Sequence, residues 1–224
     1  MHSEGDHGEE RNVTKRDHVA RRAERAEARS AKRRRKRDGR ADSGIAARKQ
    51  LGYARTSLRD IAELSGVAVG TLHYYFEDKV DLITYCVGRY KSGFMEEMQS
   101  ILAAEVAPDQ LAERFVKGLA LSIRRDAETH RLWYDIRSQA MFDPGFNEIV
   151  SEIEDALVAL VAEFLARTGQ TAMDASTAYL MLDAVFRFHL QKFLAGDKAA
   201  PLAFERQASD LLTIITSAPE TRRS

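Results

Sequence analysis

The chain has 224 residues, 44% of them hydrophobic, so it is long enough to bury one large core or two small ones. Its single cysteine, Cys86, excludes an intrachain disulfide. There is no apolar run of about eighteen residues and no apolar segment of the signal-peptide type near the N terminus, which excludes a membrane-spanning helix and predicts a cytoplasmic protein.

Residues 1–40 predict a basic, largely flexible N-terminal arm. The whole chain is neutral, but this segment has 14 Lys and Arg against 8 Asp and Glu, and the remainder has 20 against 26. After Met1, only Val13 and Val19 are large apolar residues, so burial cannot offset the entropy of ordering the segment. The run KRRRKR at residues 32–37 fits either a solvated tail or an arm that follows DNA phosphates.

Residues 41–86 predict a unit of three short helices. The first is expected to end at Gly52, a natural left-handed C-terminal position. The second begins after a capping Thr56 or Ser57 and is stopped by Gly66. The third covers residues 68–75, and this spacing is typical of a helix-turn-helix.

Long helical patterns fill the rest of the chain and predict an all-α fold. One begins after a capping Asp78, and Cys86 borders its apolar stripe, which favours a packing role for the thiol over chemistry. Pro, Gly and Asp separate the patterns that follow. The further helices are expected at about residues 108–125, 127–141, 144–168, 172–195 and 200–217.

The stretch TSLRDIAELSGVAVGTLHYYFEDKVDLI, residues 56–83, resembles the DNA-binding region of TetR/AcrR-family transcriptional regulators. The resemblance implies a helix-turn-helix head over residues 41–86, a helical ligand-binding and dimerisation domain over residues 87–218, and a short tail at residues 219–224. The positions that agree with the family pattern are Thr56, Leu58, Arg59, Ile61, Ala62, Gly66, Val67, Gly70, Thr71, Leu72, Tyr75, Phe76, Lys79 and Leu82.

The resemblance and the residue chemistry together predict DNA contacts on the helix-turn-helix, about Ser57 to Phe76. Gly70 permits close approach to a groove wall, and Thr71 beside it can bond a phosphate or a base edge. His73 has the alternative of simply facing solvent. The predicted DNA-binding residues are Thr56, Arg59, Val69, Gly70, Thr71, His73, Tyr74, Tyr75 and Lys79.

The sequence departs from the family pattern at both ends of this unit. Ala68 stands where many relatives have a small hydroxyl residue, so the recognition helix should lack a side-chain cap, a loss of about 1 kcal/mol. Arg48 lies near the position at which relatives usually have a buried phenylalanine. Gly44 falls inside the pattern of the predicted first helix. We therefore expect that helix to extend back towards Arg40.

Two stretches of the C-terminal half are candidates for a ligand site. Residues 131–146 concentrate aromatic side chains that suit either a plain core or a cavity. Residues 177–196 form a helix that is apolar on two sides, one for its own domain and one for a second subunit. Asp183, Arg187 and His189 fit a polar spot in a cavity or a charged rim of the interface. The predicted ligand-binding residues are Trp133, Tyr134, Arg137, Met141, Phe142, Asp183, Phe186 and His189.

These observations predict a sequence-specific DNA-binding regulator, most simply a repressor released from a palindromic operator by an unidentified small molecule. The resemblance implies a homodimer formed through the last two long helices. The alternative is a ligand-independent or architectural DNA-binding protein. An enzyme is a distant third, because the sequence has no Gly-x-Ser-x-Gly, His-Glu-x-x-His, Walker or paired-Cys motif. No catalytic residue, metal, cofactor or membrane partner is expected.

Overall fold

The computed structural model describes residues 36–39, 57–64, 66, 68–169 and 173–217. All regular elements within these residues are helical, which confirms the all-α prediction. Residues 36–39 are helical as well. The helix predicted before Gly52 lies outside the described residues, as do positions 1–35 of the arm. The elements are α2 (Leu58–Leu64), α3 (Val69–Tyr75), α4 (Lys79–Leu102), α5 (Pro108–Gln139), the 3-10 helix η1 (Pro144–Phe146), α6 (Asn147–Arg167), α7 (Ala175–Leu194) and α8 (Ala200–Ser217).

Helices α2 and α3 form the helix-turn-helix, and their ends follow the local chemistry. Ser57 Oγ accepts a hydrogen bond from the Asp60 amide at 3.2 Å, and the Asp60 carboxylate accepts one from the Ser57 amide at 2.8 Å. This reciprocal cap begins α2 and confirms Ser57 as a capping residue. Gly66 turns the chain with a φ of +63°, where glycine is unstrained. Ala68 makes no side-chain bond at the start of α3, also as predicted.

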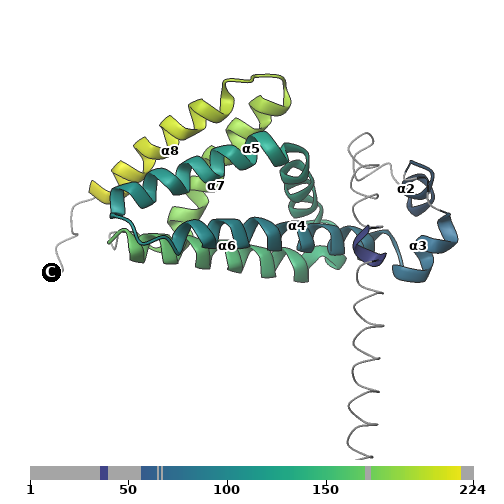
Figure 1. Cartoon of the computed structure of the whole chain (residues 1–224). Helices are drawn as coiled ribbons and strands as arrows, with labels where there is room; N and C mark the ends of the chain where they lie inside the picture. Colours follow the sequence, from purple (N-terminus) through teal and green to yellow (C-terminus); the bar gives the residue numbers. More distant parts are fainter. Residues whose placement is uncertain (1–35, 40–56, 65, 67, 170–172, 218–224) are drawn as a thin grey trace, which may run out of the picture.

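Helix α4 belongs to two hydrophobic clusters. Its first turns place Leu82 and Cys86 in a small cluster with residues of α2 and α3, which we call the head cluster. Ile83 and Val87, each one residue further on, join the large cluster of the C-terminal bundle. Figure 1 shows the head at one end of the molecule, with α4 running from it into the bundle. The head cluster consists of Leu58, Ile61, Ala62, Leu72, Phe76, Leu82 and Cys86.

The bundle is built from α4 to α8. Helix α5 packs against α4, α7 and α8, while α6 packs against α4 and α7. The two helices predicted at residues 108–125 and 127–141 form one long element, α5. This element is kinked at Asp126, whose backbone angles are non-helical, φ −121° and ψ 20°. The predicted break therefore falls at the right residue. Gly118 lets α5 approach α4 closely, since a Cβ there would lie 2.5 Å from Ile101 Cδ1.

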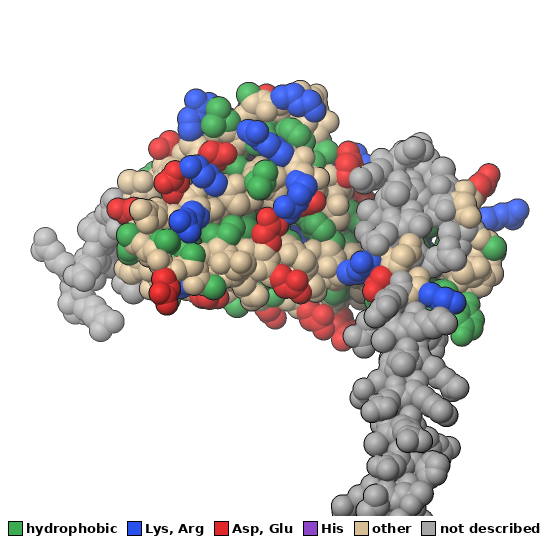
Figure 2. Space-filling model, viewed as in Figure 1, with side chains coloured by type: hydrophobic (Ala, Val, Ile, Leu, Met, Phe, Trp, Pro, Cys, Tyr) green, Lys and Arg blue, Asp and Glu red, His purple; other side chains and the backbone are tan. Residues whose placement is uncertain are grey.

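The surface of the bundle carries charges of both signs. Figure 2 shows Lys and Arg interspersed with Asp and Glu over the visible face. This mixture avoids a strong field of one sign. Among the described residues, none of the helices combines the length and apolar character that crossing a membrane requires.

The N-terminal cap of α4, the helix that joins the head to the bundle, can be tested by mutation. Asp78 accepts a hydrogen bond from the Asp81 amide at 2.8 Å. Asp78→Ala should lower the free energy of unfolding by about 1 kcal/mol because it leaves that amide without its partner. Urea unfolding measures the change. Glu96→Ala, on the exposed side of the same helix, is the control, and an equal loss in both variants would contradict a capping role.

Candidate functional site

Helix α3 is anchored by one face and exposed along the other. Leu72 is 0% and Phe76 1% exposed, so these two side chains fix the helix to the head cluster. Val69, Gly70, His73 and Tyr74 are exposed, with Tyr74 at 66%, and Thr71 and Tyr75 are half-buried. Six of the predicted DNA-binding residues therefore lie on one short, firmly held helix.

The remaining predicted DNA-binding residues flank this helix. Arg59 is exposed on α2, and Lys79 is half-buried as the first residue of α4. Thr56 lies outside the described residues. The Tyr75 ring packs against the head cluster and meets the Tyr74 ring edge-on at 4.9 Å. The tyrosine pair is thus half core and half surface.

The last residue of the basic run, Arg37, is docked onto the head, which sequence reasoning missed. The Arg37 guanidinium lies 4.1 Å from the Tyr85 ring centre and 4.8 Å from that of Phe76, and it donates to Asp81 Oδ1 at 2.9 Å. The next residue, Asp38, accepts a hydrogen bond from the Tyr85 hydroxyl at 2.5 Å. The charge run had suggested only solvent or phosphate as partners, whereas a planar guanidinium also stacks on aromatic rings.

A small inner cavity of about 50 Å³ lies in the bundle beside Lys91 of α4. The Lys91 side chain is only 5% exposed, although lysine is almost never buried without a partner. Its Nζ lies 4.9 Å from the Trp133 ring centre and 5.0 Å from that of Phe94. The cavity is lined by Lys91, Phe94, Phe115, Leu119, Tyr134, Leu157, Leu160, Val161, Tyr179, Leu182, Asp183 and Phe186.

A wider outer groove of about 710 Å³ lies beside this cavity and shares Tyr134 and Asp183 with it. These two residues are joined, since the Tyr134 hydroxyl donates to Asp183 Oδ1 at 2.7 Å. Arg137 donates to Asp183 Oδ2 at 2.7 Å and also pairs with Glu154 at 2.5 Å. A polar partition from α5, α6 and α7 therefore separates the groove from the cavity.

The structure brings together some of the predicted ligand-binding residues and separates others. Tyr134, Arg137, Met141 and Asp183 line the outer groove, and Phe186 lines the inner cavity. Trp133 is buried against Lys91.

Besides Trp133, two predicted ligand-binding residues line neither space. Phe142 is 80% exposed in the turn after α5. His189 is 4% exposed, and its Nε2 donates to Gln207 Oε1 of α8 at 2.8 Å, so this imidazole joins α7 to α8.

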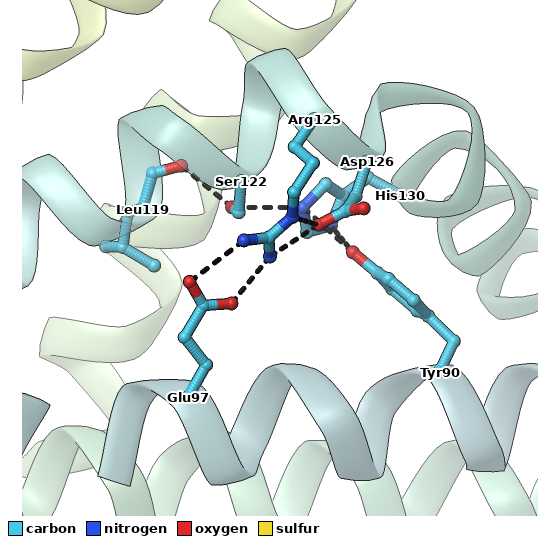
Figure 3. A network of polar contacts seen from close by, with 7 residues as sticks. All are labelled: Tyr90, Glu97, Leu119, Ser122, Arg125, Asp126 and His130. Carbon is cyan, nitrogen blue, oxygen red and sulfur yellow. Dashed lines mark hydrogen bonds and ion pairs between the residues drawn. The ribbon is translucent and has the colours of Figure 1, made fainter. Parts of the chain in front are cut away.

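A second polar network ties α4 to α5 at the kink (Figure 3). Arg125 pairs with both carboxylate oxygens of Glu97 and with Asp126. Beneath this exposed pair, the buried His130 ring bonds to Ser122 Oγ at 3.1 Å and to the Tyr90 hydroxyl at 3.0 Å. The network therefore joins α4 to α5 on both sides of the non-helical turn at Asp126.

Burial sets the protonation of His130 and Lys91 in the core. It lowers the pKa of His130 well below its ordinary value, and the nearby Lys91 ammonium and Arg125 guanidinium act in the same direction. It also lowers the pKa of Lys91 to about 7, a shift that the Asp183 carboxylate partly opposes. His130 is therefore neutral, while Lys91 titrates near physiological pH.

Lys91 was missed in the sequence because its charge suggests a surface position. A signal was present, since it falls at helical spacing between the core residues Val87 and Phe94. In the part of the chain that the structure describes, no group of three or more His, Cys, Asp or Glu is placed to hold a metal ion.

The head and the whole fold were each compared with known proteins, and both are similar to the same class of protein. The family model described as "Bacterial regulatory proteins, tetR family" matches residues 46–86, which include α2 and α3. The curated proteins contain no match to the sequence.

Three solved structures illustrate the similarity of fold. A putative TetR-family transcriptional regulator from Rhodococcus sp. is 18% identical with a TM-score of 0.65, covering 81% of this chain and 98% of its own. A putative transcriptional regulator from Saccharomonospora viridis in complex with choline is 18% identical with a TM-score of 0.67, covering 82% and 96%. The regulator FadR from Bacillus subtilis in complex with stearoyl-CoA is 18% identical with a TM-score of 0.61, covering 81% and 98%.

The fold and the head define a helix-turn-helix transcriptional regulator with a helical C-terminal bundle. The family match and the shared fold confirm the resemblance to TetR-family transcriptional regulators.

The buried lysine predicts an unusual dependence of stability on pH. Lys91→Met should raise the free energy of unfolding at pH 7 by about 3 kcal/mol, because an apolar chain would replace a buried amine. Above the folded pKa of about 7, the unfolded chain still holds the Lys91 proton that the folded chain has released, so wild-type stability rises with pH. The advantage of the variant should therefore be fully present below that pKa and shrink by about 1.4 kcal/mol per pH unit above it.

Urea unfolding at fixed protein concentration, from about pH 6 to about pH 9, measures this difference. Lys198→Met is the matched control, since this exposed ammonium lies 4.9 Å from the Phe193 ring centre. Equal free energies of unfolding for the wild type and Lys91→Met at every pH in this range would contradict the prediction.

Proposed function

We propose that this protein is a ligand-responsive repressor that binds a palindromic operator as a homodimer and is released from it by a small molecule. The observation that carries the proposal is the double role of α4, which is packed into the head at one end and into the bundle at the other. A ligand that shifts α4 within the bundle would also move the recognition helix.

The DNA-binding part of the proposal is supported by the surface of α3. A glycine, a hydroxyl, an imidazole and two phenols lie along seven residues, on a helix fixed from behind by Leu72 and Phe76. A helix of this kind fits the major groove, where such donors read base edges and phosphates. Exposed Arg59 on the neighbouring helix suits a phosphate contact.

The dimer is supported by apolar side chains left on the outside of α7 and α8. Leu180 is 54% and Phe188 50% exposed on α7, although the opposite face of that helix is already buried in the bundle. On α8, Leu202 and Ile214 are 49% and 64% exposed. A second copy of the chain would cover this surface, as an interface core requires.

The release mechanism is a change in the separation of two heads. A dimer reads two half-sites only when its recognition helices are about 34 Å apart, one turn of the duplex. Helix α4 has 24 residues, a length of about 36 Å, so a small tilt at its bundle end becomes a displacement of several ångströms at α3. A ligand that binds only the tilted form shifts the population towards it.

The proposal is tested with an operator recovered by selection from a random duplex library. Thr71→Ala and Tyr75→Phe should each weaken operator binding about tenfold in mobility-shift titrations, since each removes one hydroxyl contact. Ser92→Ala, which removes an exposed hydroxyl from α4, is the control. Sedimentation should show the same dimer for all four proteins. Unchanged titrations for both α3 variants, or a strictly monomeric protein, would contradict the proposal, and equal affinity for every duplex would favour an architectural protein.

The basic arm is tested by two truncations. Residues 1–31 contain seven basic and seven acidic residues, so removing them leaves the net charge unchanged, whereas removing residues 1–35 also removes Lys32 and Arg33–Arg35. We expect the longer truncation alone to lower operator affinity and to flatten its dependence on salt, because fewer phosphate counterions are released. Both truncations keep Arg37 on the head. Identical salt slopes for the two would show that the run is a solubility tail.

A further inference from the structure

The buried Lys91 ammonium has neighbours that attract it but none that binds it. Its contacts are with ring faces, of which those of Trp133 and Phe94 are nearest. The closest acidic influence is Asp183, whose two oxygens are already occupied by the Tyr134 hydroxyl and the Arg137 guanidinium. Among the described residues, no hydrogen bond or ion pair reaches Lys91.

Two other buried donors lack acceptors, one on the wall of the same cavity and one against Lys91. The Tyr179 hydroxyl and Trp133 Nε1 have no hydrogen-bond partner within the described residues. Tyr179 lines the inner cavity with Lys91, and Trp133 contacts Lys91 from behind. Buried polar groups are nearly always satisfied, so the unpartnered Tyr179 hydroxyl and the Lys91 side chain on the wall of one cavity indicate a site for an acceptor that is not part of the chain.

The surroundings narrow the chemistry of that acceptor. The rest of the inner cavity is apolar apart from the partition residues Tyr134 and Asp183. At about 50 Å³ it is far smaller than a typical ligand site, but the outer groove behind the partition, at about 710 Å³, is within the usual range. One buried positive charge matches one negative charge, because a second would remain unpaired in the core.

We propose that the effector is an organic carboxylate with an apolar chain, bound with its carboxylate at Lys91 and Tyr179 once the Tyr134–Arg137–Asp183 partition has opened. The inference rests on the proposed function, of which it names the ligand class. The groove has a mixed lining, and its apolar residues Ala140, Met141, Val150 and Ala184 suit the apolar chain. Arg137, released from Asp183, becomes a second cation along the entry route.

The position of Lys91 links this ligand to the head. Lys91 is five residues beyond Cys86, the last α4 residue of the head cluster. The cavity must expand to hold a carboxylate and the first part of its chain, and α4 forms one of its walls. Expansion therefore displaces the helix that carries the recognition unit.

The test uses three probes with the same eight-carbon chain: octanoate, octyltrimethylammonium and 1-octanol. Isothermal titration of the full-length dimer is expected to give octanoate the lowest Kd. Lys91→Met should weaken octanoate at least tenfold and change 1-octanol less than about twofold, because the variant loses the charge but keeps the apolar volume. Lys198→Met, which removes an exposed lysine, should leave all three Kd values unchanged.

Proton uptake separates ion pairing from a merely structural effect. The groups facing Lys91 are neutral His130 and the paired Asp183 and Arg137, so Lys91 is the group that gains a proton when a carboxylate binds. At about pH 8, titrations in buffers of different ionisation enthalpy should show uptake of about one proton per chain in wild type and none in Lys91→Met.

Three outcomes would overturn the inference: tighter binding of octyltrimethylammonium than of octanoate, an unchanged octanoate Kd in Lys91→Met, or no difference in proton uptake. Operator binding without ligand is measured on the same samples. If the protein binds its operator but gives one of these outcomes, the proposed function stands and the proposed ligand class is rejected. If the protein prefers octanoate through Lys91 but selects no operator, the repressor proposal is rejected and the carboxylate-binding site stands.

Discussion

The sharing of one helix between two close-packed cores is the constraint on which the rest of the structure depends. Leu82 and Cys86 of α4 are buried with the head, and Ile83 and Val87 are buried with the bundle. Close-packed interiors resist small shifts of one element. Helix α4 therefore cannot slide or rotate without disturbing both cores, and a rearrangement in the bundle is passed on as movement of a rigid rod.

Two of the buried basic side chains of the bundle, His130 and Lys91, are in contrasting situations. His130 has hydrogen-bond partners on α4 and α5 and stabilises the kink as a neutral group. Lys91, on α4, is surrounded by ring faces and has no acceptor within the described residues. The first arrangement is how folded proteins satisfy a polar group, and the second is typical of sites where a missing partner arrives from outside.

The sequence predicted most of what is local and little of what depends on distant packing. Capping by Ser57 and Asp78 and the break at Asp126 follow from neighbouring residues, so they could be read in advance. For Lys91 the sequence shows only its helical spacing between Val87 and Phe94, because its burial also depends on the Trp133 ring, which α5 contributes. His189 was assigned with Asp183 and Arg187 to a polar spot in a cavity or a charged rim of the interface, but the crossing of α7 and α8 directs its ring to Gln207. Positions 40–56 are outside the described residues, so the expected extension of the first helix stays a prediction.

The stacking of Arg37 on Tyr85 and Phe76 fixes the point from which the basic run departs. Residues 32–36 directly precede that point, so none is further than about 18 Å from it along the chain. A duplex lying against α3 would thus meet these charges as tethered partners, at an effective concentration near the millimolar range rather than that of a free peptide. In such a complex the weak individual attractions would add as avidity, and the docking of Arg37 would set how much of it is available.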